Sequence, residues 1–544
     1  MDFTSRRSVV GAFNGFATLA AGLGVALLAA AVVRPSAFPL LAVADSVVDM
    51  TPEPVKQWAI RTFGESDKLV LIIGVIVVLT AASLALGRLA LGRLTVARWA
   101  VTVIGALGVA AAVTRPDSAY TDALPTLIGI VAALGALTLL TRRAELLLKA
   151  ASARQEAEPA DAGDTASADA EEAGAAEGAG ARSARVETVD RDRRRLLVAG
   201  AGTLGVAAVA GGVGGALFRT LNVDPASAAA ALPRPARPAA PLPRGVDLPI
   251  PGLSPFTTPA DDFYRVDTAL IVPRISPEDW TLRIHGMVER EVELTYADLL
   301  KLPMFEHDTT LACVSNEVGG DLVGNARWLG ASLADVLRMA RPRAGADQIL
   351  SRSSDGMTIG TPVQTVLDGR DAQLAVAMNG APLPLGHGFP VRMVVPGLYG
   401  YVSATKWVTE LKLTRYADER AYWVDRGWAD RAEIKTASRI DVPRSGARLR
   451  PGRVTVAGVA WAQHRGVDAV EVRADDGAWE EARLAQVPGI DTWRQWAYDW
   501  QATPGTHRLQ VRATDGEGRT QTGEETPIAP DGSTGWHTLT VTVR

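Results

Sequence analysis

Cysteine and histidine are scarce in this chain, and both shortages restrict what it can do. The 544 residues contain one cysteine, Cys313, and six histidines, none of which precedes His285. One thiol cannot form an internal disulfide, and the chain has no Cys-x-x-Cys-His motif for covalent haem. The first half also lacks the paired histidines that ligate a haem. We therefore expect no haem in this chain, so any electrons are exchanged with another molecule.

Charge and aromatic residues are also sparse in informative places. The net charge is only −4, which argues against a nucleic-acid-binding surface. Residues 152–188 contain no aromatic residue and are rich in Ala, Glu, Asp and Gly, so they cannot bury enough apolar surface to fold. We expect a disordered cytoplasmic linker over 151–195. Its end, Arg193-Arg194-Arg195, resembles a twin-arginine export signal, or else an ordinary basic flank of a membrane span.

Long hydrophobic runs, by contrast, are plentiful before residue 220. Five runs without a polar stripe fit membrane spans: Gly11–Val33, Leu69–Leu86, Trp99–Val113, Ala123–Leu140 and Leu196–Phe218. We expect a membrane domain with four spans over 1–150 and a fifth span over 196–218. A Pro/Ala-rich stretch over 219–245 is typical of a semi-rigid tether.

Basic residues indicate how these runs would be oriented. They lie before the first run, between the second and third runs, after the fourth run and before the fifth run. These residues are Arg6, Arg7, Arg88, Arg93, Arg98, Arg142, Arg143, Lys149, Arg154, Arg191, Arg193, Arg194 and Arg195. Because cytoplasmic loops carry the excess of Lys and Arg, the N-terminus is expected inside the cell. Everything after Phe218 is then expected outside, anchored to the plasma membrane.

Residues 246–435 alternate short strand-like and helical runs, which predicts an α+β domain. The expected elements are strands at Trp280–Val288 and Thr309–Cys313 and helices at Tyr296–Leu302 and Leu333–Ala340. Cys313 ends a strand and is followed by a Ser/Asn/Gly-rich loop that we expect to extend to Gly330. A free cysteine by itself is most often a buried structural residue.

Gly/Pro-rich loops in the same region carry three cationic or hydrogen-bonding groups, His387, Arg392 and Lys406. Such loops let the backbone approach a ligand, and Arg or Lys there suits a phosphate. Each residue alone has a plainer explanation, as a structural histidine or a surface ion pair. Together with Cys313 they suggest an anionic ligand beside a thiolate, which is a soft ligand for a cofactor-borne metal.

Two stretches, 309–337 and 378–407, resemble the sulfite oxidase family of molybdopterin-dependent oxidoreductases. The motifs that carry the resemblance are the Cys313 loop, Ala326-Arg327-Trp328-x-Gly330, Met378-Asn379-Gly380-x-Pro382-Leu383-Pro384, His387-Gly388-x-Pro390-Val391-Arg392 and Lys406-Trp407. The resemblance extends from about Phe256 to the C-terminus. It implies an enzyme with molybdenum-molybdopterin that transfers an oxygen atom in a two-electron reaction. The apolar runs, the export-like arginines and the domain arrangement indicate a bacterial, membrane-anchored type.

The resemblance also implies roles for individual residues. Cys313 matches the sulfur ligand to molybdenum, and His387 and Arg392 match residues that hold the pterin and its phosphate. The other expected cofactor-binding residues are Asp261, Tyr264, Arg265, Asp355, Ser403, Ala404, Thr405 and Lys406. Arg265 and Tyr422 are further expected to shape the substrate pocket.

Two departures from the family pattern concern the substrate. Family members that oxidise sulfite have an arginine shortly after the cysteine, whereas this chain has Glu317, and Val266 replaces a usual histidine. A poorly solvated carboxylate near the metal would repel sulfite. Three functions stay open: oxidation of a small oxyanion or sulfur compound, reduction of a sulfoxide of the protein methionine sulfoxide type with electrons from a membrane donor, and a scaffold that has lost the metal.

Strand-like runs and turn signals over 436–544 predict an immunoglobulin-like β-sandwich. The runs are Arg453–Ala462, Val467–Arg473, Trp493–Trp500, His507–Thr514 and His537–Val543. In the family this domain often mediates dimerisation, so the resemblance implies a homodimer. The other expected partners are a small-molecule substrate, membrane lipid and a cytochrome or quinone-linked electron carrier, but no nucleic acid.

Overall fold

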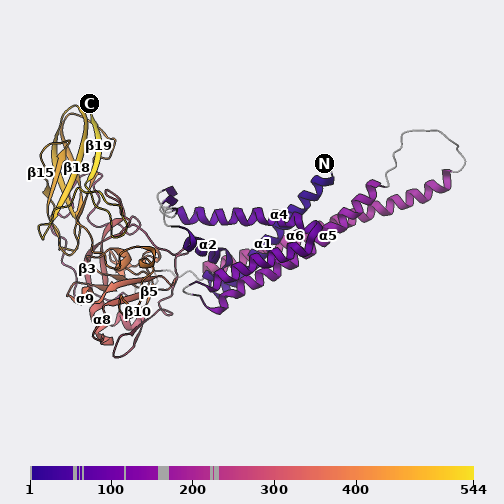
Figure 1. Ribbon diagram of the computed structural model, residues 1–544, viewed down its shortest axis with the longest axis horizontal. Helices are drawn as coiled ribbons and strands as arrows, with labels where there is room; N and C mark the ends of the chain where they lie inside the picture. Colours follow the sequence, from indigo (N-terminus) through magenta and orange to yellow (C-terminus); the bar gives the residue numbers. More distant parts are fainter. Residues whose placement is uncertain are drawn as a thin grey trace. The chain divides into compact units, whose positions relative to one another are not determined.

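The chain is divided into two compact units, Met1–Asn222 and Val223–Arg544. The structure is a computed structural model that describes residues 3–52, 55, 58–59, 62–63, 66–115, 118–156, 171–220, 225 and 232–544. The first unit is helical and the second is built mainly from sheets (Figure 1). The boundary expected between residues 435 and 436 lies inside the second unit and stays a prediction.

Five long helices form the described part of the first unit. They are α1 (Phe3–Val33), α2 (Pro39–Met50), α4 (Asp67–Val113), α5 (Ala123–Glu156) and α6 (Glu171–Thr220). Four described helical segments are long and apolar enough to cross a membrane: Ser5–Val33, Lys68–Val113, Tyr120–Ala150 and Asp190–Leu217. The sequence patterns did not predict α2, a shorter helix.

Helix α4 contains the second and third apolar runs because the chain reverses within it. Arg93 has non-helical torsion angles, φ −141° and ψ 57°. Before this break α4 runs antiparallel to α1, since Gly15 packs against Ser83 and Gly11 against Arg88. After the break the chain returns, and Arg115 donates a hydrogen bond to a carbonyl just beyond the end of α1. The reversal therefore falls between the two predicted runs.

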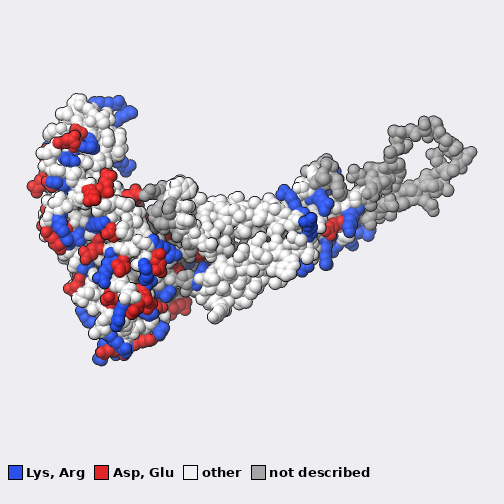
Figure 2. Space-filling view, in the orientation of Figure 1, with Lys and Arg blue, Asp and Glu red and all other residues white. Residues whose placement is uncertain are grey.

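Basic residues gather at one end of the helical unit. Val10, Leu91, Ala144 and Leu196 pack in one cluster there, so parts of α1, α4, α5 and α6 meet at the same level. The arginines next to these positions therefore lie at a common end. Figure 2 shows Lys and Arg gathered beside a belt of the helical unit that has almost no charged residue on the visible face.

Two stretches differ from the expectation of irregular chain. Residues 171–188 are helical and belong to α6, because Ala and Glu are strong helix formers; residues 157–170 lie outside the described part. The end of the expected tether is part of the second unit and is hydrogen-bonded to β3. There, Ala236 N–H donates to the Met304 carbonyl (2.8 Å), and Glu306 N–H donates to the Arg237 carbonyl (3.0 Å).

Two sheets form the first part of the second unit. One has the order β2-β1-β10-β5-β6, and the other has the order β3-β4-β7-β8 with β9 also on β7. The strands are β1 (Thr281–Gly286), β2 (Val292–Thr295), β3 (Met304–Ala312), β4 (Val323–Ser332), β5 (Gln348–Ser353), β6 (Thr358–Pro362), β7 (Gln373–Met378), β8 (Ala381–Pro382), β9 (Arg392–Val394) and β10 (Val408–Thr414). The short helices α7 (Tyr296–Leu300), α8 (Leu333–Ala340) and α9 (Val363–Leu367) accompany them.

The loop after Cys313 is shorter than the sequence suggested. Val323–Ser332 forms β4, which pairs antiparallel with β3 so that Thr309 faces Ala326 and His307 faces Trp328. Strand β4 is buried on both faces, so it lacks the alternation that marks a half-exposed strand. The cysteine loop is therefore a hairpin connection over 313–322.

Two further sheets lie in the C-terminal part, with orders β11-β13-β17-β16 and β12-β19-β18-β14-β15. Their strands are β11 (Ala437–Val442), β12 (Arg448–Leu449), β13 (Gly452–Trp461), β14 (Val467–Ala474), β15 (Glu480–Glu481), β16 (Arg483–Leu484), β17 (Arg494–Ala502), β18 (Gly505–Asp515) and β19 (His537–Val543). Val456 and Trp496 of one sheet share a buried core with Val470 and Val541 of the other. The five predicted strands are present, and the immunoglobulin type stays a prediction.

Close packing of α1 on α4 gives a testable prediction. A Cβ at Gly15 would lie 1.8 Å from the Ser83 carbonyl oxygen, whereas a Cβ at Gly74 would meet nothing within 4 Å. We expect Gly15→Leu to destabilise the helical unit by about 1–3 kcal/mol, because it overpacks a backbone contact. Gly74→Leu is the matched control. Thermal unfolding in detergent checks both, and equal effects of the two variants would contradict the packing.

Candidate active site

Cys313 follows β3 directly and opens the 313–322 loop. Its N–H donates to the Leu322 carbonyl (2.9 Å), and its own carbonyl accepts from Asn316 N–H (3.1 Å). The side chain is buried, and burial raises the pKa of the thiol, although hydrogen bonds from Ser315 oppose this shift. The free thiol is therefore protonated at neutral pH, and a bound metal would be needed to hold it as a thiolate.

Arg392, on β9, is a buried cation next to the ring of Trp328. Its guanidinium lies 4.9 Å from the centre of that ring, and its Nη1 donates to the His387 carbonyl (3.1 Å). The residue is 5% exposed, and its Nε has no hydrogen-bond partner among the residues that the structure describes. Burial lowers the pKa of Arg392 to about 10, so it stays charged at neutral pH. An anionic ligand would satisfy both the charge and the unpaired N–H.

Asp267 joins two of the cations that the sequence predicted. Its Oδ2 lies 2.8 Å from Lys406 Nζ and 2.8 Å from Arg265 Nε. Burial lowers the pKa of Lys406 to about 8, and Asp267 limits the shift. Sequence reasoning missed Asp267, because nothing in the local pattern shows that it meets a lysine 139 positions away.

His387 faces the same group of charges. Its Nε2 lies 3.0 Å from the Ala260 carbonyl oxygen, so Nε2 carries the proton and donates. Burial, with the nearby charge of Arg392, lowers the pKa of His387 to about 4, so the ring is neutral at pH 7. The next residue, Gly388, has φ +109°, and a Cβ there would lie 2.9 Å from Arg392 Cβ. A side chain at position 388 would therefore clash with Arg392, so only glycine fits at this position of the motif.

Two tyrosines are electrostatically coupled to the cysteine. Burial raises the pKa of the Tyr264 phenol, a thiolate at Cys313 would raise it further, and Arg392 lowers it. Burial raises the pKa of Tyr399 to about 12, and a thiolate at Cys313 would again add to the shift. Tyr399, which sequence reasoning missed, lies in a buried Gly/Pro-rich turn. Tyr264 was predicted.

Tyr422 has a different set of neighbours. The guanidinium of Arg426 lies 3.5 Å from the centre of the Tyr422 ring. The backbone N–H of Tyr422 donates a hydrogen bond to Thr358 Oγ1 (3.1 Å). Its expected position at the substrate stays a prediction.

The remaining predicted residues use their polar groups within the fold or lie at its surface. Thr405 Oγ1 lies 2.6 Å from Ser351 Oγ, and Ser403 Oγ donates to the Leu398 carbonyl (3.1 Å). Ala404, between them, is buried. These residues shape the backbone beside Lys406.

The two predicted carboxylates differ in their exposure, since Asp261 is exposed and Asp355 is half-buried. Asp355 lies in the turn after β5, where its Oδ1 accepts from Met357 N–H (3.3 Å). Met357 also accepts a hydrogen bond from the Thr268 hydroxyl through its sulfur (3.2 Å), so this turn packs next to the segment that carries Asp267.

The donor set fits a molybdenum-molybdopterin cofactor. Arg265 and Lys406 pair with one carboxylate, Asp267, and the charge of Arg392 also acts on Lys406. This excess of positive charge suits a phosphate, and Arg392 Nε is a free donor for it. Within the described residues no group of three or more His, Cys, Asp or Glu could hold a metal ion. A metal at Cys313 would therefore need further ligands from elsewhere, which suits a metal carried by a cofactor.

Loops of the C-terminal sheets hold the strand that presents Cys313. Thr310, three residues before the cysteine, donates its N–H to the Asp491 carbonyl (2.9 Å). Its carbonyl accepts from Gln463 Nε2 (3.0 Å), and its hydroxyl accepts from Trp493 N–H (2.8 Å). The hydroxyl also donates to Asn325 Oδ1 of β4 (2.9 Å). Residues far apart in the sequence therefore fix the end of β3.

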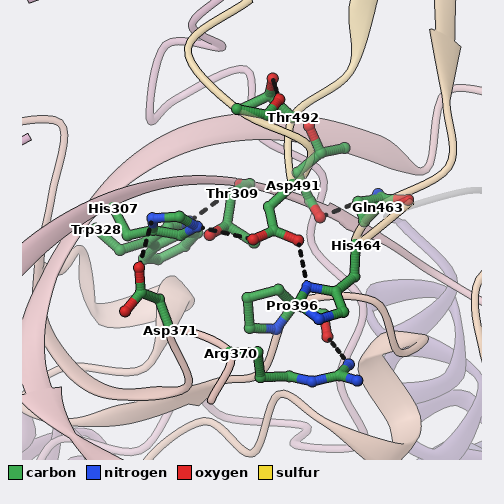
Figure 3. Close-up of polar contacts among 12 residues, drawn as sticks. His307, Thr309, Trp328, Arg370, Asp371, Pro396, Gln463, His464, Asp491 and Thr492 are labelled. Carbon is green, nitrogen blue, oxygen red and sulfur yellow. Dashed lines mark hydrogen bonds and ion pairs between the residues drawn. The ribbon is translucent and has the colours of Figure 1, made fainter. Parts of the chain in front are cut away.

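A carboxylate between two histidines strengthens this junction (Figure 3). Asp491 Oδ2 lies 3.0 Å from His307 Nε2, and Asp491 Oδ1 lies 3.2 Å from His464 Nδ1. Burial by itself would raise the pKa of Asp491, but the hydrogen bonds and charges of the two histidines lower it to about 2. His307 Nδ1 in turn lies 3.3 Å from Asp371. Asp491 thus stays ionised and ties β3 to the loop that contains His464.

Two adjacent threonines of β3 provide a matched test of this junction. Thr309 and Thr310 are both 0% exposed, but only the Thr310 hydroxyl is hydrogen-bonded, since Thr309 Oγ1 has no partner in the described part of the chain. We expect Thr310→Val to lower the free energy of unfolding by about 1–3 kcal/mol, because it leaves buried partners unsatisfied. Thr309→Val should change it little or increase it. Denaturant unfolding followed by tryptophan fluorescence checks the pair, and the reverse order would contradict the assignment.

The lowered pKa of His387 predicts a pH dependence of stability. Its pKa is about 4 in the folded chain against 6.5 without the fold. The folded state binds fewer protons, so the stabilising contribution is complete above pH 6.5 and is lost as the pH falls from 6.5 to 4. We expect the cofactor-free protein to lose about 2 kcal/mol of stability across this window. Unfolding curves of wild type and His387→Gln at several pH values measure the difference, and parallel pH profiles would refute it.

The comparisons with known proteins agree with this donor set. The family model of the oxidoreductase molybdopterin binding domain matches residues 269–423. Sulfite oxidase from Gallus gallus is 30% identical over 340 residues, which cover 52% of this chain and 72% of the chicken protein. Mitochondrial sulfite oxidase from Mus musculus is 30% identical over 324 residues, which cover 50% of this chain and 58% of the mouse protein. The chain thus spans little more than half of the mouse protein.

Among solved structures, the sulfane dehydrogenase SoxCD from Paracoccus pantotrophus matches with a TM-score of 0.47 and 23% identity, over 53% of this chain and 82% of that one. The family-model match contains Cys313, His387, Arg392 and Lys406. The cysteine, the cations around it and the likeness to chicken sulfite oxidase lead to one conclusion: this chain belongs to the sulfite oxidase family of molybdopterin-dependent oxidoreductases.

Proposed function

We propose that this chain is a membrane-anchored, extracytoplasmic molybdenum-molybdopterin oxidoreductase that moves one oxygen atom to or from a small sulfur compound or oxyanion. The observation that carries the proposal is the buried thiol of Cys313 coupled to a group of cations with one carboxylate. A scaffold without metal has no use for this combination, since the buried charge and the free donor of Arg392 are costly without an anion.

Each residue of the chain has a defined task in this proposal. Cys313 ligates the metal through its sulfur, and Arg392 and His387 hold the pterin and its phosphate. Lys406 adds positive charge that favours the thiolate, since its charge lowers the pKa of Cys313. Tyr264 stays protonated at neutral pH, so its hydroxyl can donate a hydrogen bond. The bound cofactor supplies the metal that exchanges an oxygen atom and two electrons with the substrate.

A sulfur oxyanion such as sulfite is the substrate class that the relatives favour, because those compared are named sulfite oxidases. The sequence raised one objection, the carboxylate of Glu317 in the cysteine loop. Glu317 is exposed, so water and salt screen its charge and weaken the repulsion. Reduction of a sulfoxide with electrons from a membrane donor is the same chemistry in the opposite direction and remains the second candidate.

The arrangement of the helical unit supports the membrane topology of the proposal. The arginines near the start of α1, at the break in α4, after the apolar part of α5 and before the apolar part of α6 lie at one end, which we assign to the cytoplasm. Helix α6 starts its apolar part at that end, after Arg193-Arg194-Arg195, and so leads the chain toward the opposite side. Residues 246–435 and an immunoglobulin-like domain over 436–544 would then lie outside the cell.

Metal analysis of a cysteine variant tests the proposed function. The full chain, made in a host that synthesises the cofactor, should contain about one molybdenum per chain and a thiolate-to-metal absorption band. Cys313→Ser should lose that band, whereas Thr309→Val, a buried change four residues away, should keep both metal and band. Sulfite should then reduce the metal in the wild-type protein. Methionine sulfoxide, added to the reduced protein, tests the opposite direction.

Absence of molybdenum from the wild-type protein would overturn the proposal and leave the scaffold reading. A band that survives in Cys313→Ser would instead show that the thiol is not the ligand.

A further inference from the structure

The helical unit contains a half-open apolar cavity of about 160 Å³. Its walls come from α1, α2, α5 and both arms of α4, which are the parts of that helix before and after the break at Arg93. Representative lining residues are Gly22, Val43, Leu86, Gly105 and Thr126. Because both arms contribute, the cavity exists only when α4 folds back at its break. It lies wholly within the unit that we propose to be embedded in the membrane.

The lining of the cavity excludes a charged occupant. No Asp, Glu, Lys, Arg or His is among the residues that line it, and an ion without a partner in such surroundings is strongly disfavoured. A dry apolar cavity of roughly 150 Å³ can take up one benzene-sized ring. The space of about 160 Å³ therefore suits an uncharged ring of that size or a short length of alkyl chain.

One hydroxyl on the wall has no partner. Thr18 and Ser83 also line the cavity, but their hydroxyls donate to the Asn14 carbonyl (2.8 Å) and the Thr80 carbonyl (2.8 Å) of their own helices. Thr126 is 4% exposed, and its Oγ1 has no hydrogen-bond partner within the part of the chain that is described. Thr126 is thus the one lining residue whose hydroxyl is unpaired among the described residues, and an oxygen acceptor on an uncharged ligand would satisfy that hydroxyl.

We propose that this cavity binds the head group of an isoprenoid quinone, with one quinone carbonyl accepting a hydrogen bond from Thr126. The ring matches the volume, the carbonyl matches the hydroxyl, and the isoprenoid tail is compatible with the surrounding membrane. An acyl chain of a lipid fills such a space equally well but has no oxygen along its length for Thr126.

The inference rests on the proposed function, which requires a two-electron partner. Transfer of an oxygen atom from water to the substrate releases two electrons and two protons. A quinone takes up both and becomes a quinol, so the reaction balances without another reagent. The helices before His285 have no histidine to hold a haem, so a small redox molecule is the carrier that this unit can bind.

Direct binding measurements test the site. The full-length protein with its cofactor is placed in nanodiscs of synthetic phosphatidylcholine, and a tritiated benzoquinone with a ten-carbon alkyl chain is titrated. We expect saturable binding of about one quinone per chain. Thr126→Val should weaken it about fivefold to tenfold, the effect of one hydrogen bond, and Val43→Phe should abolish it by filling the space.

Two matched variants separate the hydrogen bond from general damage. Thr126→Ser keeps the hydroxyl and should restore wild-type affinity. Thr138→Val removes a hydroxyl of the same helix that does not line the cavity and donates to the Leu134 carbonyl (2.7 Å), so it should leave affinity unchanged. Wild-type affinity in Thr126→Val, or no saturable binding in the wild type, would overturn the inference. A photoactivatable acyl chain that labels the cavity in that second case identifies lipid as the occupant.

A second readout distinguishes failure of this inference from failure of the proposed function. Sulfite-driven reduction of ferricyanide reports on the molybdenum site without the quinone. Ferricyanide reduction without quinone binding would overturn the inference alone. A protein that binds quinone but has no molybdenum, and reduces neither ferricyanide nor quinone with sulfite, would overturn the proposed function. The quinone-binding site would then still stand.

Discussion

Buried positive charge is the constraint on which the candidate active site depends. Arg392 and Lys406 are both withdrawn from water, and burial lowers the pKa of each. Asp267 offsets only part of this charge, through Lys406 and Arg265. The neutral ring of His387 and the protonated phenol of Tyr264 are consequences of the same dry surroundings. A buried cation with an unpaired donor is costly without an anion beside it, and the phosphate of the proposed cofactor would offset that cost.

The C-terminal sheets contribute to this site although none of their residues was predicted to bind the cofactor. Thr310 links β3 to the loops that carry Gln463 and Asp491, and Asp491 adds a charged link to two histidines. The position of Cys313 at the end of β3 is therefore set partly by loops of the C-terminal sheets, outside the part of the unit that carries the cations. A metal ligand must be held to within a fraction of an ångström, and a strand anchored from both sides meets that demand better than a free loop.

The helical unit has its own internal order. Small residues let α1 and α4 approach closely, as Gly11 and Gly15 show against Arg88 and Ser83, and this close contact is typical of helices that pack without a hydrophobic driving force. Charges are confined to its ends, where Arg34 and Arg115 contact the buried carboxylate of Asp122 on the side away from the basic cluster. Between the two ends lies the apolar cavity with the single free hydroxyl of Thr126.

The sequence by itself determined the elements whose evidence is local. The apolar runs became the helices of the first unit, Leu333–Ala340 became α8, and His537–Val543 became β19, because composition and periodicity act within a few residues. The motifs also identified Cys313, His387, Arg392 and Lys406. Tertiary structure alone decided the rest. Strand β4 shows no alternation because both of its faces are buried, Asp267 and Tyr399 matter only through partners distant in the sequence, and the cavity exists only because α4 reverses. Local patterns record which face of an element avoids water, but they do not record which distant residue that face meets.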